Sequence, residues 1–208
     1  MRYVLAAAAA FAIAAPVIAQ EMVLPKEAPG KPDPKVAKSG SYKVDPGHTQ
    51  ALFTVSHLGW TNYTGQFTNG TGSLVLDTKA PARSKVDISF PIDKIRTTVS
   101  ELDTNLIGAT YFDAAKFPTA RFVSTRIVPT GASTATITGD LTIKGVTKPI
   151  TLKARFIGAG PEFWGAKKEA IGFAATASIK RSDFAMGMDV PLVSDNVDLV
   201  INAGFEAE

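Results

Sequence analysis

The chain has 208 residues and no cysteine, with 22 Lys and Arg residues against 19 Asp and Glu residues, which gives a formal net charge of +3. A chain of this length is expected to form one medium-sized core. The lack of cysteine excludes disulfide bonds, so we expect packing to hold the fold together. The small positive charge is scattered rather than gathered into a patch, and we therefore expect no nucleic acid partner.

Residues 1–19 have the pattern of a secretory signal peptide. A short basic start, "MRY", precedes the apolar run "VLAAAAAFAIAA", and the small residues Val17 and Ala19 stand ahead of Gln20. A membrane anchor is the alternative, but the run is shorter than the roughly 20 residues that a span requires. Pro16 also interrupts the end of the run. We expect cleavage near Ala19.

Residues 20–41, "QEMVLPKEAPGKPDPKVAKSGS", combine many Pro and Lys residues with few large apolar side chains. Such a segment cannot bury enough apolar surface to offset the entropy lost on ordering. We expect a flexible tether here, followed by one domain over residues 42–208.

Three segments at the start of this domain, residues 42–57, 71–77 and 84–93, alternate polar and apolar side chains with a period of two. The third segment shows the rhythm clearly in its apolar residues, Val86, Ile88, Phe90 and Ile92. Alternation of this kind is typical of β-strands with one buried and one solvated face.

The period changes between Asp93 and Pro118. Apolar residues there fall at i, i+4, i+7 and i+11, as in a helical stripe: Ile95, Val99, Leu102 and Leu106. Thr98 and Glu101 have the spacing of a capping box, which favours a helix start at this point. We expect one or two short helices between strands, covering the mouth of a barrel or packing on one face.

Five further segments repeat the period of two: 120–128, 134–145, 149–158, 169–180 and 196–206. Most links between strands are short and rich in Gly, Pro, Asn and Asp, as antiparallel hairpins require. Eight antiparallel strands with one apolar face close most economically on themselves, because closure removes exposed edges. We therefore expect a mainly β protein built as an eight-stranded antiparallel barrel, with a two-sheet sandwich as the alternative.

Both histidines lie in "DPGHTQALFTVSHLGW", nine positions apart. If residues 49–57 form one strand, this odd spacing places His48 and His57 on opposite faces, about 30 Å apart. They cannot share a metal ion, and a chain without cysteine or a third histidine gives no support to a transition-metal site. We expect no metal, and we expect His48 to bond the backbone near Asp45.

His57 continues an apolar strand face made of Ala51, Phe53 and Val55. It is either a hydrogen-bonded core histidine or a polar group beside a ligand. The chain has no G-x-S-x-G motif and no Gly-rich nucleotide-binding loop, so we assign no catalytic residue and predict that the protein is not an enzyme. Four carboxylates are assigned to turns or caps: Asp45, Asp103, Asp113 and Asp183.

Four segments, in order, resemble the YceI-like family of polyisoprenoid-binding proteins: "DPGHTQALFTVSHLGW", "LDTNLIGATYFDAAKFPTARFVST", "GDLTIKGVTKPITL" and "RSDFAMG". The resemblance covers residues 42–208. Thr49 and Tyr111 replace a serine and a phenylalanine of the family pattern. Ala185 stands where glycine is usual, at a turn where alanine tolerates a positive φ poorly.

The resemblance implies a lipocalin-like barrel in the bacterial periplasm. It implies binding of a long isoprenoid lipid, of polyprenyl or quinone type, in an apolar channel with no further cofactor. The residues themselves favour a container, because an eight-stranded barrel can hold one ligand between its inward faces.

The ligand site is predicted at Phe53, Val55, His57, Phe90, Leu102, Leu106, Phe112, Phe173, Ile179, Arg181, Asp183, Met186, Met188 and Leu199. The two methionines would adapt to an irregular lipid. Arg181 and Asp183 are candidates for contacts with a headgroup, with a structural ion pair between them as the alternative.

Two other functions stay open at this stage. An enzyme acting on a lipid or quinone in the same channel would use His57 as its titratable group. A packed β module for adhesion or assembly would have a filled interior. Transient contact with a membrane and a homodimer are further open alternatives.

Overall fold

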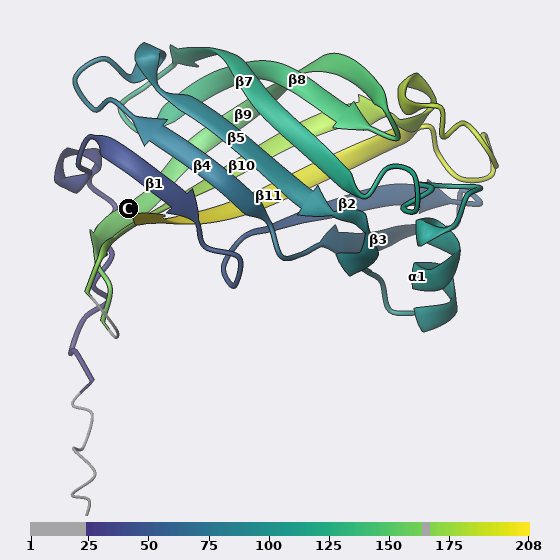
Figure 1. The fold of residues 1–208 in the computed structure, drawn as a ribbon, viewed down its shortest axis with the longest axis horizontal. Helices are drawn as coiled ribbons and strands as arrows, with labels where there is room; N and C mark the ends of the chain where they lie inside the picture. The colour runs from purple at the N-terminus through teal and green to yellow at the C-terminus, as the bar shows by residue number, and fades with distance from the viewer. Residues whose placement is uncertain (1–23, 164–166) are drawn as a thin grey trace, which may run out of the picture.

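The structure, a computed structural model, describes residues 24–163 and 167–208 (Figure 1). The predicted signal peptide, residues 1–19, lies outside the described residues. The strands are β1 (Gly40–Val44), β2 (Gln50–His57), β3 (Thr61–Phe67), β4 (Thr71–Leu76), β5 (Lys85–Pro91), β6 (Ile95–Arg96), β7 (Thr119–Pro129), β8 (Thr134–Ile143), β9 (Val146–Pro161), β10 (Glu169–Lys180) and β11 (Asn196–Ala207). The helices are α1 (Ser100–Ile107) and the 3₁₀ turns η1 (Pro34–Val36), η2 (Pro81–Arg83), η3 (Ile92–Lys94) and η4 (Arg181–Phe184).

Eight strands close into a barrel in the order β1, β4, β5, β7, β8, β9, β10, β11, and β11 pairs back to β1. All of these pairings are antiparallel. Figure 1 shows the strands wrapping obliquely around a common axis. The closed ring confirms the predicted eight-stranded barrel rather than the sandwich, and it sends alternate side chains of each strand inward.

Three positions in the wall are each shared by two short strands. β11 pairs with β1 through residues 205–207 and with β2 through residues 198–202. β3 and β4 share the next position of the wall in the same way, because β4 pairs with β1 and β3 pairs with β2. β6 follows β5 and pairs with β3. The wall therefore holds eleven strands in eight positions.

The prediction of one continuous strand over residues 42–57 is wrong, because β1 and β2 are separated by a loop. Residues 45–49 form a loop in which the Asp45 carboxylate accepts a hydrogen bond from the Gly47 N–H at 2.8 Å. Pro46 has no N–H for a ladder, so the strand breaks here. β3 is absent from the sequence prediction because its central inward position is Gly65, which adds no apolar signal.

α1 is the helix predicted between residues 93 and 118, and it lies at one end of the barrel (Figure 1). The predicted capping box is wrong, because Val99 is the N-cap and makes no side-chain cap bond. Instead, the Asp103 carboxylate accepts hydrogen bonds from the Thr97 N–H at 2.6 Å and the Thr97 hydroxyl at 2.7 Å. The segment before α1 is therefore fixed by a residue from inside the helix.

The described part of the predicted tether contacts the barrel. The backbone N–H of Lys31 donates to the Ala159 carbonyl at 2.9 Å, and the Ala159 N–H donates back at 3.1 Å. The Lys38 ammonium lies 2.6 Å from the Glu169 carboxylate. Residues 31–41 differ from a free tether because backbone and charged groups at the ends of β9 and β10 offer them partners.

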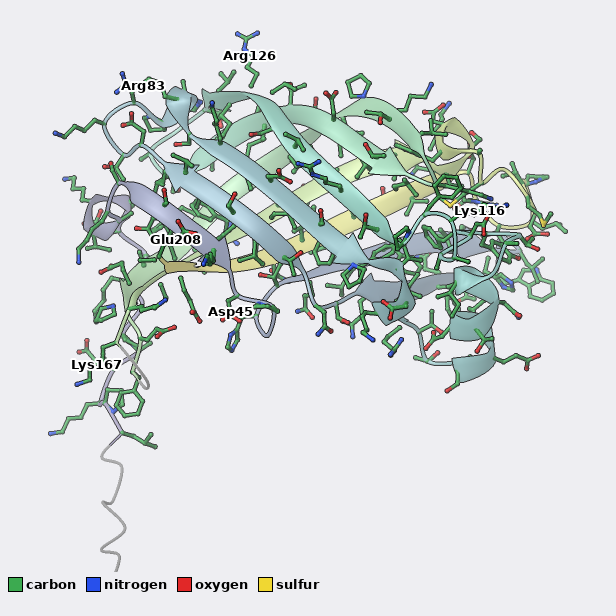
Figure 2. All side chains as sticks on the ribbon, viewed as in Figure 1. Asp45, Arg83, Lys116, Arg126, Lys167 and Glu208 are labelled. Atoms are coloured by element: carbon green, nitrogen blue, oxygen red, sulfur yellow. The ribbon has the colours of Figure 1, made fainter. Side chains whose placement is uncertain are left out.

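Buried side chains form two clusters in the barrel. One is built around Phe67, Ile95 and Phe184, and the other around Tyr42 and Phe205. The charged side chains labelled in Figure 2 lie on the outside of the barrel. None of the helices in the described residues is both long and apolar enough to cross a bilayer.

Candidate functional site

The barrel interior contains a cavity of about 530 Å³ at the end where α1 lies. Its wall follows the period of two, so that Ala51, Phe53, Val55 and His57 of β2 all face it. The inward residues of the other strands and the apolar side of α1 complete the wall. The interior is therefore hollow, which contradicts the filled interior of a packed adhesion module.

Phenylalanine rings form part of this wall. Phe67 lies at the centre, with its ring centroid 5.6 Å from those of Phe53 and Phe112 and 6.4 Å from that of Phe90. Phe53 lies directly over Gly65, where an added Cβ would come within 2.3 Å of the ring. Glycine at this position lets the Phe53 ring lie against the wall instead of filling the cavity.

A second cavity, of about 270 Å³, lies in the other half of the barrel. Four residues belong to the walls of both cavities: Ile88, Phe122, Leu152 and Ile201. We call this set the waist. The Phe122 ring lies on Gly139, where a Cβ would come within 2.4 Å of it. The waist therefore lies between the two cavities of the barrel interior.

Polar groups of the main cavity gather near its α1 end. The Tyr111 hydroxyl donates to the Asp189 carboxylate at 2.9 Å. This hydrogen bond raises the pKa of the Tyr111 hydroxyl above its ordinary value, with burial as a second cause. The Tyr63 hydroxyl lies 3.1 Å from that of Thr98. Tyr63, Tyr111, Asp189 and His57 are therefore among the polar residues that line this cavity.

His57 lines the main cavity, and its imidazole has no hydrogen-bond partner among the described residues. This differs from the hydrogen-bonded core histidine that the sequence left open. His48 lies outside, in the exposed loop before β2, with its ring against the Asp45 carboxylate. The backbone N–H of His48 donates to the Asp45 carbonyl at 3.3 Å, which confirms the predicted bond near Asp45.

Arg181 is buried and holds the loop of residues 185–195. Its guanidinium donates to the carbonyls of Met186 at 2.6 Å, Val193 at 2.8 Å and Ser194 at 2.9 Å. These contacts use every nitrogen of the guanidinium. Arg181 therefore lines the cavity as an anchor of the loop that forms its mouth.

Three of the predicted site residues lie elsewhere. Asp183 is exposed, and the Arg181 guanidinium donates to backbone carbonyls, so the alternative of an ion pair between them is wrong. Met188 is 52% exposed and lines neither cavity. Phe173 lines the second cavity, where its ring packs against Phe156 and Phe205.

The other predicted site residues all line the main cavity: Phe53, Val55, His57, Phe90, Leu102, Leu106, Phe112, Ile179, Arg181, Met186 and Leu199. The sequence prediction missed Phe122, although it lies on the apolar face of the predicted strand over 120–128. It also missed Tyr111, Asp189 and Leu192, and no periodic signal marks these loop residues. No group of three or more metal-ligating side chains occurs within residues 24–163 and 167–208.

Comparisons with known proteins agree with this architecture. The YceI protein of Escherichia coli is 38% identical over 168 residues, which cover 80% of this chain and 86% of that protein. The crystal structure of a Campylobacter jejuni YceI protein is similar with a TM-score of 0.64 and 30% identity, covering 74% of this chain and 90% of that one. A polyisoprenoid binding domain from Saccharophagus degradans shares the fold with a TM-score of 0.62 at 14% identity, covering 82% of this chain and all of that one.

A sequence profile of the YceI-like domain matches residues 42–205. The match begins inside β1 and ends inside β11, so it spans the whole closed ring of strands. The barrel, the order of its motifs and these similarities show that the chain belongs to the YceI-like domain family.

Proposed function

We propose that this protein binds a long-chain isoprenoid lipid of polyprenyl or quinone type and carries or sequesters it. The observation that carries the proposal is the apolar cavity of about 530 Å³ inside a closed barrel. The polyisoprenoid binding domain from Saccharophagus degradans has the same fold. No other cofactor enters the proposal.

The lipid chain would lie along the barrel axis. Its tail would pass the waist into the second cavity, where Phe156, Phe173 and Phe205 pack edge to face. Its polar end would remain near Tyr111 and Asp189 at the α1 end. Each CH₂ group buried in this way contributes about 0.8 kcal/mol, less the cost of ordering the chain.

The test is to purify the protein without detergent, extract it for lipid analysis, and titrate the emptied protein with a polyprenyl alcohol. Val55→Trp would fill the cavity from β2, and we expect it to abolish binding. The matched control is Val200→Trp, because Val200 lies on the outer face of β11 and is 46% exposed. No lipid in the extract together with no binding of polyprenyl alcohol by the parent protein would refute the proposal.

The proposal also places the protein in the periplasm, on the strength of the signal-peptide pattern in residues 1–19. Cell fractionation and N-terminal sequencing of the mature protein test it. A mature chain starting near Gln20 in the periplasmic fraction is the expected result. An unprocessed chain in the cytoplasmic fraction would contradict it.

A further inference from the structure

Exposed apolar side chains gather around the mouth of the main cavity. They come from three short loops: the β2–β3 turn, the segment before α1, and the loop of residues 185–195. We call them the apolar rim: Leu58 (36% exposed), Trp60 (84%), Val99 (47%), Met188 (52%), Val190 (41%) and Leu192 (60%). Of the twelve exposed large apolar side chains in the described residues, six lie in this rim, so it is a patch rather than a scatter.

Hydrogen bonds join two of the three rim segments, the β2–β3 turn with the end of β2 and the loop of residues 185–195. The Leu58 N–H donates to the Leu192 carbonyl at 2.6 Å, and the Ser194 N–H donates to the Ser56 carbonyl at 2.9 Å. The Ser56 N–H donates to the Ser194 hydroxyl at 2.9 Å. Arg181 holds the second loop from inside. The backbones of these two loops are therefore held together beside the cavity mouth.

Leu58 has a backbone conformation that a leucine does not favour. Its φ is 55°, followed by Gly59 at 70°, and the Trp60 N–H closes the turn on the His57 carbonyl at 3.1 Å. Asparagine or glycine would fit this φ better. Folding alone does not explain a large apolar residue here, and such strain is typical of functional positions.

The charges of these loops indicate the kind of partner. Residues 57–63, 97–100 and 185–194 contain no Lys or Arg and one carboxylate, Asp189. Asp189 is already bonded to Tyr111. The partner must therefore be uncharged where it meets the rim. A lipid bilayer at the boundary of its headgroups and chains is such a surface, and exposed Trp side chains favour that boundary.

We propose that the apolar rim docks onto a lipid bilayer and opens the main cavity directly to it. The proposal rests on the proposed function and adds the route by which the lipid enters. Leu58 and Leu192 belong both to the rim and to the cavity wall. A chain moving between bilayer and cavity along them stays in apolar surroundings, whereas a route through water would expose each CH₂ group.

The experiment measures partitioning onto phosphatidylcholine vesicles. The chain has two tryptophans, so Trp164→Phe leaves Trp60 as the only reporter. We expect Trp60 emission to shift to the blue on vesicle binding. In the full chain with both tryptophans, Trp60→Thr combined with Met188→Gln should weaken partitioning at least about tenfold, since each removes a large apolar contact.

Matched controls separate the rim from apolar surface in general. Val75→Thr and Val200→Thr remove exposed apolar groups of the barrel wall, each 46% exposed, and should leave partitioning unchanged. Leu58→Gly relieves the φ strain, so weaker partitioning there would not reflect unfolding. Neither Trp60 nor Met188 lines a cavity, and their variant should still bind a polyprenyl alcohol from detergent solution.

Unchanged partitioning of the rim variant, or no shift of Trp60 emission, would overturn the proposal. Partitioning that requires anionic lipid or disappears in high salt would also overturn it, because it would be electrostatic. Dissociation of a dimer by the same variant, without vesicle binding of the parent, would assign the rim to contact between copies. Absence of polyprenyl binding in all variants and in the parent would instead refute the proposed function, whatever the vesicles show.

Discussion

Single residues at the mouth of the barrel hold backbone conformations that their side chains do not favour. Ala185 has φ 56°, and Leu58 has φ 55°. Hydrogen bonds hold the turn at Ala185, whose N–H donates to the Ser182 carbonyl at 3.2 Å. The sequence pointed to this position, because Ala185 stands where the family pattern has glycine. The turn keeps the left-handed geometry and the alanine bears the strain.

Ala185→Gly should raise the free energy of unfolding by up to about 1 kcal/mol. A left-handed conformation costs an L-residue about 1–2 kcal/mol, and glycine avoids this cost. Glycine also loses more conformational entropy on folding, which offsets part of the gain. Urea unfolding followed by circular dichroism measures the change. A clear loss of stability in this variant would show that the alanine methyl makes contacts that outweigh the strain.

Arg181→Lys should loosen the loop of residues 185–195. A lysine ammonium cannot reach three carbonyls that lie around a planar fork, and each unsatisfied buried carbonyl costs about 1–3 kcal/mol. Hydrogen exchange should show reduced protection of the loop, while β7 to β9 keep theirs. Exchange rates like those of the parent in this loop would mean that Arg181 does not hold it.

Elements rather than single residues decide which side chains face the cavity. The period of two identified the inward faces of β5 and β11 from the sequence, because the inward face of each strand is much more apolar than its outward face. The same pattern predicted that Phe173 is inward, but not that it lies beyond the waist, since this depends on the register of β10 with β9 and β11. Pairing between distant strands is invisible to a local period.

Phe122 of β7 should control the length of chain that the barrel accepts. Phe122→Ala widens the waist, so longer polyprenyl alcohols should bind more tightly than to the parent, whereas Phe122→Trp should weaken their binding. Replacing a fully packed phenylalanine by alanine typically lowers the free energy of unfolding by about 3–5 kcal/mol. Phe122→Ala should lower it by less, because the ring already borders two cavities. Titration with polyprenyl alcohols of increasing length measures the profile.

Phe53→Ala is the control for this series, because it enlarges the main cavity without touching the waist. Its preference among chain lengths should resemble that of the parent. If all variants keep one length profile, the waist does not limit the chain.

Glu206 at the end of β11 should make stability depend on pH. A hydrogen bond with the Glu162 carboxyl raises the pKa of Glu206 in the folded protein, with burial as a second cause. The folded state then holds this proton to a higher pH than the unfolded state, so stability is lost as the pH rises from the unfolded pKa through the folded one. The charge of Glu162 is a further cause, because it disfavours the ionised form of Glu206.

Glu206→Gln should therefore raise the midpoint of thermal unfolding at neutral pH. The midpoints at neutral and at mildly acid pH should then differ less in this variant than in the parent protein. Glu208→Gln, an exposed carboxylate near Lys43, is the control and should change this pH dependence little. Thermal unfolding at several pH values measures both. A neutral-pH midpoint lowered by Glu206→Gln would contradict the assignment.

At the scale of the whole molecule, the two ends of the barrel differ. The end at α1 carries the rim, the polar groups and the loop of residues 185–195. Pro34 and Ala37 from the N-terminal segment line the second cavity. Figure 1 shows β1, which follows this segment, at the end of the barrel away from α1. This segment precedes the family match, which begins at residue 42. The molecule therefore has two apolar cavities along its axis, one bordered by the rim and the other by its own N-terminal segment.

The closed barrel and most of its cavity wall were predictable, because burial imposes a period on strand residues. Leu102 and Leu106 followed from a helical stripe, although Ile95 and Val99 of the same stripe lie in β6 and at the N-cap. The mouth was not predictable. Tyr111 and Asp189 meet across 78 positions of the chain through two irregular loops, and no spacing announces such a contact.

The most direct test of the account is a crystal structure of the protein purified without detergent. We predict one elongated density running from Tyr111 and Asp189, past the waist, into the second cavity, with an isoprenoid lipid in the matching extract. Side chains closing the passage, or only ordered water in both cavities of protein that also fails to take up polyprenyl alcohol, would contradict the account.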